Sequence, residues 1–406
     1  MTGRERVLKA LSFQPTDRVP MDLGGMDSTG ISCFAYPALV QALGLPPRPT
    51  RVHDTGQMLA FPDTDVLDAL DCDVVTARMD MHNAFPQPEL WHPYDFNGRL
   101  SALVRNPSLF EALEDGTILQ PQCGRKMPPT SHVFEAEHGG QPLLLTGDIP
   151  KPSLDEVKAS QEKERLGDRD IKAVRENCRR ARETTDRAIL FNGPGAGIGI
   201  ANFTGIAMFP MLCLTEPGYV ADLHDIVTRY AVERIEALLP EVAAYIDVYM
   251  CSSDDWGTQN QTIAAPQVYR DLFKPYYRRI TGTIHAIAPR VKTFLHSCGA
   301  IYDLLDDIVD SGFDALNPVQ WTAGGHSYRE WKDKCRNRLA LWGGGVNTQD
   351  TLPLGTIEDV RREVAGVVQY LGQDGGYVFC GIHNLLAETP PEKIIAMYET
   401  ARTLRP

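Results

Sequence analysis

The stretch that decides the fold is residues 291–311, VKTFLHSCGAIYDLLDDIVDS. Val291–His296 is a short β-type run that ends in small and polar residues, and helical spacing follows over Ile301–Ser311. A strand followed directly by a helix is the repeating unit of a parallel βαβ fold. This stretch therefore predicts an α/β protein.

The same alternation recurs along the whole chain. The predicted strands are Arg18–Leu23, Asp73–Ala77, Ala188–Asn192, Asp247–Ser252, Val291–His296, Asp314–Pro318, Leu339–Gly343 and Tyr377–Gly381. The clearest helical patterns are Leu154–Arg182, Tyr219–Ala244, Pro266–Ile287, Ile301–Ser311, Ile357–Leu371 and Pro391–Leu404. Eight strands close a (β/α)8 barrel, so we predict a TIM barrel. A doubly wound open sheet competes, but no phosphate-binding glycine fingerprint follows the first strand.

The stretch from about Asp80 to Lys151 interrupts this rhythm. It is rich in Pro, His and aromatic residues, and Gly116–Gln122 and His132–Leu145 resemble hairpins. We interpret it as an insertion that caps one end of the barrel. Residues 1–406 then form a single domain.

Composition narrows the class of protein. The chain has 406 residues, of which 43% are apolar, too many for a disordered chain. Length alone allows two or three domains, but one barrel with insertions also fills it. The net charge of −13 argues against nucleic-acid or membrane surfaces as partners.

The cysteines and the N-terminus indicate a compartment. Nine cysteines are scattered without a CxxC pair, which is typical of reduced thiols in a cytoplasmic protein. The N-terminal residues predict an amphipathic helix without the apolar core of a signal peptide. No stretch approaches the ~18–20 apolar residues that span a bilayer.

The sharpest chemical feature is the pair His296 and Cys298 at the end of the fifth predicted strand. Side chains two apart on an extended segment point to the same side, so both can reach one ion. Imidazole and thiolate are ligands that zinc prefers. The alternative is a buried histidine beside a small apolar cysteine.

A second cluster, Cys380 and His383, follows the eighth strand. The carboxyl ends of all barrel strands share one rim, where barrel active sites lie. Either residue could join His296 and Cys298 as a metal ligand, and the spacing does not choose between them. Alternatively, Cys380 packs inside the barrel and His383 hydrogen-bonds a substrate.

Other polar residues also fall at or near predicted strand ends. Candidates for catalysis are Asp254, Asp255, Asn317 and Asp22. Candidates for orienting a cofactor are Asn192, Gln259, Gln320 and Asn347. Adjacent acids could supply a general base, a metal ligand or a hydrogen bond to a cofactor, although one of them could instead cap a helix.

A run of ordered motifs spans nearly the whole chain. It comprises residues 4–11 with 17–20, residues 254–259 followed by 273–276, and residues 296–299, 316–320, 344–349 and 389–392. With these motifs the chain resembles the uroporphyrinogen decarboxylase superfamily, and within it the zinc- and corrinoid-dependent methyltransferases. The resemblance implies a single barrel domain.

The resemblance also implies a ligand set. In those methyltransferases a His-x-Cys pair and a later Cys hold zinc, and His296 and Cys298 match the pair. The position of the later Cys holds His383 here, with Cys380 three residues earlier. True uroporphyrinogen decarboxylases resemble one another in an Arg-rich segment after the first strand, whereas residues 21–27 of this chain contain no Arg. Decarboxylation of a porphyrinogen is therefore not expected.

The leading hypothesis is a zinc-dependent methyltransferase. It would move a methyl group between a methylcobalamin-type corrinoid, carried by a partner protein, and a small-molecule thiol or methylated substrate. One alternative is a decarboxylase or related lyase that acts on a smaller acid. Another is a corrinoid- or tetrapyrrole-binding module without catalysis.

Overall fold

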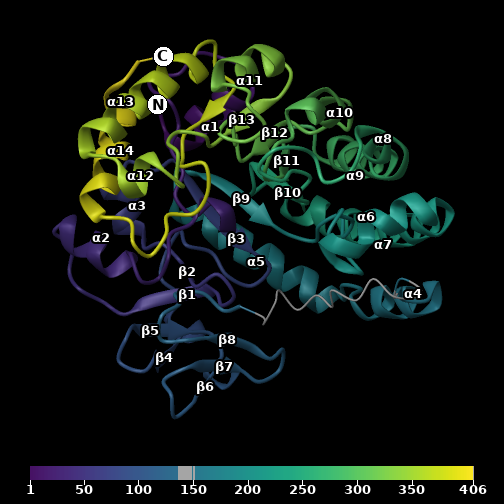
Figure 1. Ribbon diagram of the computed structural model, residues 1–406, viewed down its shortest axis with the longest axis horizontal. Coiled ribbons are helices and arrows are strands. Elements are labelled where there is room, and N and C mark those ends of the chain that lie inside the picture. The colour runs from purple at the N-terminus through teal and green to yellow at the C-terminus, as the bar shows by residue number, and fades with distance from the viewer. Residues whose placement is uncertain (136–148, 150, 406) are drawn as a thin grey trace.

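The barrel is built around a curled parallel sheet. The computed structural model describes residues 1–135, 149 and 151–405 (Figure 1). Seven strands pair in the order β14-β13-β12-β11-β10-β9-β3, which is their order along the chain read backwards, with the strands β4 to β8 (residues 92–127) inserted between β3 and β9. They are β3 (Val74–Arg78), β9 (Ala188–Asn192), β10 (Val248–Ser253), β11 (Lys292–His296), β12 (Ala315–Asn317), β13 (Ala340–Trp342) and β14 (Tyr377–Val378).

The first predicted strand closes the sheet, although it forms only a β-bridge. Met21 pairs in parallel with Phe379, just beyond β14. On the other edge, the Asp73 N–H donates to the Met21 carbonyl at 2.7 Å. Pro20 has no N–H to donate, which shortens the ladder. The predicted (β/α)8 barrel is thus confirmed, with its eighth position filled by a very short segment.

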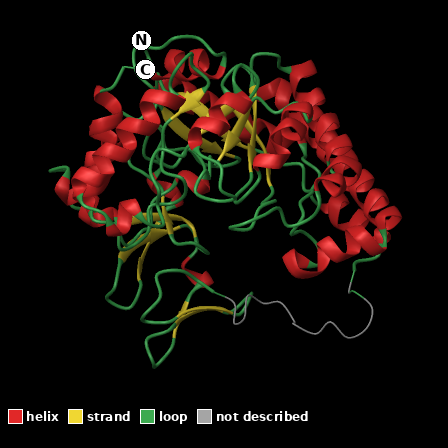
Figure 2. Ribbon diagram, turned by 45° about the horizontal axis from the view of Figure 1, so that its top comes forward, coloured by secondary structure: helices red, strands yellow, loops and turns green. Residues whose placement is uncertain are grey.

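Side chains alternate between two cores along each strand. Leu190, Phe294 and Trp342 pack inside the barrel, whereas Ile189 and Phe191, next to Leu190, pack outward among the residues that contact the helices. This period of two is the geometry of a strand buried on both faces. Helices flank the barrel strands, as Figure 2 shows.

Two of the predicted helices are broken. Leu154–Arg182 is two helices, because the Gly167 N–H donates to the Asp170 side chain and starts a new helix there. Pro266–Ile287 also divides, at Phe273, just before Pro275. The α-helices are α1 (Gly3–Leu11), α2 (Tyr36–Ala42), α3 (Thr64–Ala69), α4 (Leu154–Lys163), α5 (Asp168–Thr184), α6 (Gly205–Thr215), α7 (Pro217–Val242), α8 (Pro266–Leu272), α9 (Lys274–Ile287), α10 (Leu305–Asp310), α11 (Tyr328–Cys335), α12 (Thr351–Leu354), α13 (Ile357–Leu371) and α14 (Pro391–Thr403).

A cap made of two small sheets lies on one side of the barrel (Figure 1). One sheet has the order β2-β1-β5-β4 and the other β6-β7-β8. The strands are β1 (Thr50–Asp54), β2 (Leu59–Ala60), β4 (His92–Asp95), β5 (Ser101–Val104), β6 (Glu111–Ala112), β7 (Ile118–Gln120) and β8 (Arg125–Met127). The cap therefore begins about 30 residues earlier than predicted. Of the predicted hairpins, Gly116–Gln122 contains β7, and most of His132–Leu145 lies outside the described residues.

The cap is tied to the rim formed by the carboxyl ends of the strands. Asn384, after β14, donates from Nδ2 to Gln57 Oε1 at 3.0 Å. His132 Nδ1 lies 2.9 Å from Glu388 Oε1. The prediction that one end of the barrel is capped is confirmed in this respect, whereas the single domain over residues 1–406 stays a prediction. Within the described part of the chain, no helix is both long and apolar enough to cross a membrane.

Candidate metal centre

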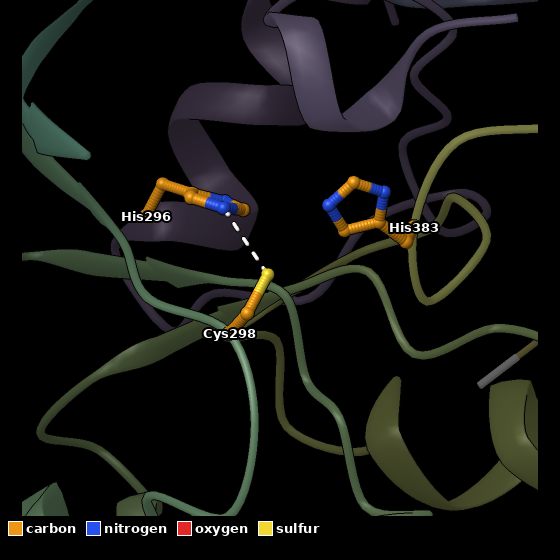
Figure 3. A group of neighbouring side chains, drawn as sticks. All are labelled: His296, Cys298 and His383. Carbon is orange, nitrogen blue, oxygen red and sulfur yellow. Dashed lines mark hydrogen bonds between the residues drawn. The ribbon is translucent and has the colours of Figure 1, made fainter. Parts of the chain in front are cut away.

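Three side chains meet on the capped rim. His296 ends β11, Cys298 follows it by two residues, and His383 comes from the loop after β14. One ligand atom from each residue lies within 4.8 Å of the others, and Figure 3 shows the three side chains converging. In the described residues, no other set of three or more His, Cys, Asp or Glu side chains forms such a group.

Hydrogen bonds set the tautomer of His296. Its Nδ1 lies 2.8 Å from Asn317 Oδ1, at the end of β12. Asn317 donates from Nδ2 to the Trp342 carbonyl at 2.9 Å, which turns Oδ1 toward the imidazole. Because Oδ1 only accepts, Nδ1 carries the proton and donates it. In the neutral imidazole the lone pair is therefore on Nε2, which lies 3.3 Å from the Cys298 sulfur and has to lose its proton before it binds a metal.

The loop that carries Cys298 is held from two sides. The Cys298 N–H donates to Asp255 Oδ1 at 2.8 Å, and the Gly299 N–H donates to Gln320 Oε1 at 2.8 Å. Gly299 has φ +87° and packs so closely on Gly257 that a Cβ there would lie 2.2 Å from its carbonyl oxygen. Only glycine fits this close backbone approach.

Charge in the centre is balanced locally. Burial opposes protonation of His296, but the Cys298 sulfur and the Asp255 carboxylate raise the pKa of His296 well above its usual value. Burial, together with the neighbouring His296, lowers the pKa of His383 to about 4. His383 is therefore neutral at pH 7, the form in which histidine binds metals.

Of the two residues left open as a third ligand, the structure brings His383 to the group and not Cys380. Cys380 is buried inside the barrel with Trp342 and Val378. Burial raises the pKa of its thiol well above the usual value. Cys380 points inward like Val378 because they are two residues apart in an extended segment. His383 lies beyond Gly381, where that alternation has ended.

Two of the candidate acids are part of the buried framework. Asp254 accepts hydrogen bonds from the Ile200 N–H, Trp256 Nε1 and the Tyr277 hydroxyl, each at 2.6 Å. Asp22 is fully buried and accepts from Trp342 Nε1 at 2.9 Å. Burial raises the pKa of Asp22 to about 6. Asp255 differs from both, since its side chain is 48% exposed and its Oδ1 lies 3.3 Å from His296 Nε2.

The four candidate amides mainly hold local structure. Gln320 supports Gly299, as above, and Gln259 donates to the Thr322 carbonyl at 3.1 Å. Asn347 accepts from the Gln349 N–H at 2.9 Å, which stabilises a turn. Asn192 donates to Thr76 Oγ1 at 2.9 Å. The structure brings none of these four amides into the metal-ligand group, by which we mean His296, Cys298 and His383. A role for the amides in cofactor binding stays a prediction.

The three donors fit zinc. Ligands at ~2.0–2.1 Å for nitrogen and ~2.3 Å for sulfur lie about 3.5 Å apart around a tetrahedral ion. The separation of 3.3 Å between His296 Nε2 and Cys298 Sγ is close to that value. One sulfur and two nitrogen donors leave a fourth position for a substrate, as in catalytic zinc sites. The site therefore fits the ion that the sequence led us to expect.

The loop after the first barrel segment also contacts this group, and the sequence did not predict that contact. Ser28 donates to Asn317 Oδ1 at 2.6 Å, and its Oγ lies 3.0 Å from His296 Nδ1. The preceding residue, Asp27, bonds to Arg78 and His53. The loop of residues 23–30 crosses the barrel mouth, because Asn192 after β9 donates to the Gly25 carbonyl at 3.4 Å and the Gly30 N–H donates to Asn384 after β14 at 3.1 Å. Only Asp27 and the glycines of this stretch indicate a functional loop.

Comparison with known proteins places the chain in a family. The model of the family described as uroporphyrinogen decarboxylase (URO-D) matches residues 136–404, more than half of the chain. The chain belongs to the URO-D family. Among curated URO-D relatives, the uroporphyrinogen decarboxylase of Legionella pneumophila strain Corby is 26% identical over 183 residues, which is 45% of this chain and 48% of that protein. That of Psychromonas ingrahamii is 27% identical over 173 residues, 42% and 45% of the two chains.

The chain thus spans about half the length of the curated URO-D relatives it matches. A solved structure resembles it over nearly its whole length. The methyltransferase from Methanosarcina mazei has a TM-score of 0.52 and 19% identity, covering 99% of this chain and 98% of that one. At this identity the likeness establishes the shared barrel fold.

Proposed function

We propose that this URO-D family member is a zinc-dependent methyltransferase of the cytoplasm. It would move a methyl group between a corrinoid on a partner protein and a small-molecule thiol or methylated substrate. The observation that carries the proposal is the group of His296, Cys298 and His383, with the His296 tautomer set for metal binding. The shared fold with a methanogen methyltransferase supports it.

Zinc bound to these residues would supply one chemical effect: it lowers the pKa of a substrate thiol, normally about 8.5, so that the thiolate reacts at neutral pH. The protein residues provide the rest. Asn317 keeps the proton on His296 Nδ1, and Asp255 holds the loop that carries Cys298. Cys298 and His383 are partly exposed, so the group is open to a ligand from the rim.

Metal analysis tests the zinc half of the proposal. We expect about one zinc per chain in anaerobically purified protein and in the control variants Cys123→Ser and His326→Ala, which alter a cysteine and a histidine outside the site. His296→Ala and Cys298→Ala should lose it. Zinc content that is the same in all five proteins would overturn the metal site.

A spectral assay tests methyl transfer. The absorbance of methylcobalamin should fall when the enzyme and a thiol acceptor are added, and Cys298→Ala should abolish the change while Cys123→Ser retains it. No change with any thiol, and no methylation of cob(I)alamin by any methylated donor, would overturn the corrinoid half.

Decarboxylation of a porphyrinogen, the activity in the names of the curated relatives, is less well supported here. The loop after the first barrel segment contributes the acid Asp27, and Asp255 is a second acid on the rim. A substrate with many carboxylates would meet the Asp255 carboxylate and find one arginine, Arg78, which is already paired with Asp27. Release of CO₂ from a candidate acid by metal-free protein would favour the lyase instead.

A further inference from the structure

An ion pair lies on the rim beside the metal-ligand group. Asp27 begins the short 3-10 turn Asp27–Thr29, and Arg78 is the last residue of β3. Arg78 Nη2 donates to Asp27 Oδ1. The Asp27 side chain is 38% exposed and that of Arg78 is 22% exposed. Neither the motifs nor the proposed function assigns this pair a role.

The cap holds the Asp27 carboxylate in one orientation. His53 of β1 bonds through Nε2 to Asp27 Oδ1 at 2.9 Å. Burial opposes ionisation of Asp27, but hydrogen bonds and charge from His53 and Arg78 lower its pKa to about 2. The carboxylate is therefore charged at neutral pH. Both bonds use Oδ1, and no hydrogen bond from the described residues reaches Oδ2.

Arg78 also has hydrogen-bond donors that no described residue accepts from. A guanidinium has five N–H donors, and one of them serves Asp27. Its Nε is buried without a partner, so the donors that a ligand can reach are those of the two Nη atoms. An arginine fixed by a carboxylate on one side presents its remaining donors as a fork for a second carboxylate. The pair thus offers an open anionic oxygen next to an open cationic fork.

This pair lies within reach of the reacting centre. Ser28, the residue after Asp27, has its Oγ 3.0 Å from His296 Nδ1. Since consecutive Cα atoms are 3.8 Å apart, the Cα of Asp27 is within about 9 Å of the His296 ring. A small molecule that bonds the pair would therefore lie beside the metal-ligand group.

We propose that Asp27 and Arg78 bind the small-molecule substrate, and that this substrate is a zwitterion with a cationic nitrogen at Asp27 and a carboxylate at Arg78. A simple cation would meet the positive charge of Arg78, and a simple anion the negative charge of Asp27. Only a ligand with both charges gains at both positions. The inference rests on the proposed function in taking this rim as the substrate site.

Binding to the zinc-loaded protein, measured by titration calorimetry without corrinoid, tests the charge requirement. Glycine betaine, choline and 3,3-dimethylbutyrate form one set of probes: the second lacks the carboxylate, and the third replaces the cationic nitrogen with carbon. L-Cysteine, cysteamine and 3-mercaptopropionate form the matching thiol set. We expect the zwitterion of at least one set to bind at least tenfold more tightly than its two partners. Selectivity in the first set indicates a methylated donor, and selectivity in the second a thiol acceptor.

Two variants assign the charges to residues. Arg78→Gln should remove the preference over the probe without a carboxylate, and Asp27→Asn the preference over the probe without a cationic nitrogen. Asp225→Asn and Arg279→Gln, a matched surface ion pair between α7 and α9, should retain both preferences. Thermal melting and zinc content of each variant show that it is folded.

The inference is overturned if a single-charge probe binds as tightly as the zwitterion in both sets, or if the preferences persist in both variants. These results are distinct from failure of the proposed function. Selective zwitterion binding by a protein that never changes a corrinoid spectrum would retain the substrate site and overturn methyl transfer.

Discussion

Replacing Asn317 with Ala should weaken zinc binding without removing a ligand. Asn317 Oδ1 accepts from His296 Nδ1 at 2.8 Å and from Ser28 at 2.6 Å. Without that acceptor, the proton is free to occupy Nε2, the atom that faces Cys298. Loss of a group that orients a metal-binding histidine costs about 10–100-fold in affinity. This corresponds to about 1.4–2.7 kcal/mol, since a factor of ten is 1.36 kcal/mol.

Ser28→Ala provides a graded comparison. It removes one hydrogen bond to Asn317 Oδ1 but leaves the acceptor for His296 in place, so zinc affinity should fall by less than tenfold. Asn347→Ala is the matched control, because the Asn347 side chain hydrogen-bonds within its own turn and contacts none of the three residues of the metal-ligand group.

The assay is competition for zinc with a chromophoric chelator, and the visible spectrum of cobalt-substituted protein reports the ligand geometry. The free energy of unfolding of each metal-free variant is measured in urea, because Asn317→Ala also leaves the buried Trp342 carbonyl without its partner. Zinc affinity within twofold of wild type in a folded Asn317→Ala protein would refute the orientation argument.

Further substitutions distinguish the proposed metal ligands from residues that only stabilise the fold. His383→Ala should reduce zinc affinity at least tenfold, whereas Cys380→Ala should keep zinc and lower only the free energy of unfolding; the reverse pattern in metal analysis would identify Cys380 as the ligand. Asp254→Ala should destabilise the protein by about 3 kcal/mol or more in urea unfolding, because three buried donors lose their acceptor; a loss below about 1 kcal/mol contradicts this. Burial opposes ionisation of Asp314, but hydrogen bonds with His285 and Thr293 outweigh it and lower the pKa of Asp314 to about 2. The ionised carboxylate therefore adds about 2 kcal/mol to the free energy of unfolding above pH ~4, and this stabilisation is lost as the pH falls toward 2. Asp314→Asn should flatten the unfolding free energy over that range, and an unchanged pH dependence would rule this out.

Strand positions were predictable because each barrel strand is buried on both faces and is followed by a helix. The eighth strand shows the limit of that pattern: Tyr377–Gly381 is predicted, and the paired strand covers Tyr377–Val378. Helix ends were harder to predict. The residues around Gly167 keep helical spacing, and the break depends on a local hydrogen bond to Asp170 that competes with the helix.

The metal-ligand group was only partly predictable. His296 and Cys298 share one local segment, so alternation along the strand brings them together. His383 lies on an irregular loop beyond Gly381, where spacing does not specify direction. The role of Ser28 was not predictable for another reason. Ser28 and His296 are 268 positions apart in the sequence, and they meet only because the loop that carries Ser28 crosses the barrel mouth.

The candidate metal centre can form only after nearly the whole chain has been synthesised, because the barrel closes between its first and last segments. Met21 pairs with Phe379, and the Gly30 N–H donates to Asn384. A ribosome that has made the chain as far as β13 has therefore produced a sheet that still lacks β14 and the loop that carries His383. Because N-terminal regions emerge first, the first segment can bond Asp73 early but must wait for nearly the whole chain before Phe379 is made. The three side chains of the candidate metal centre and the paired edges of the sheet therefore come together in the same late step.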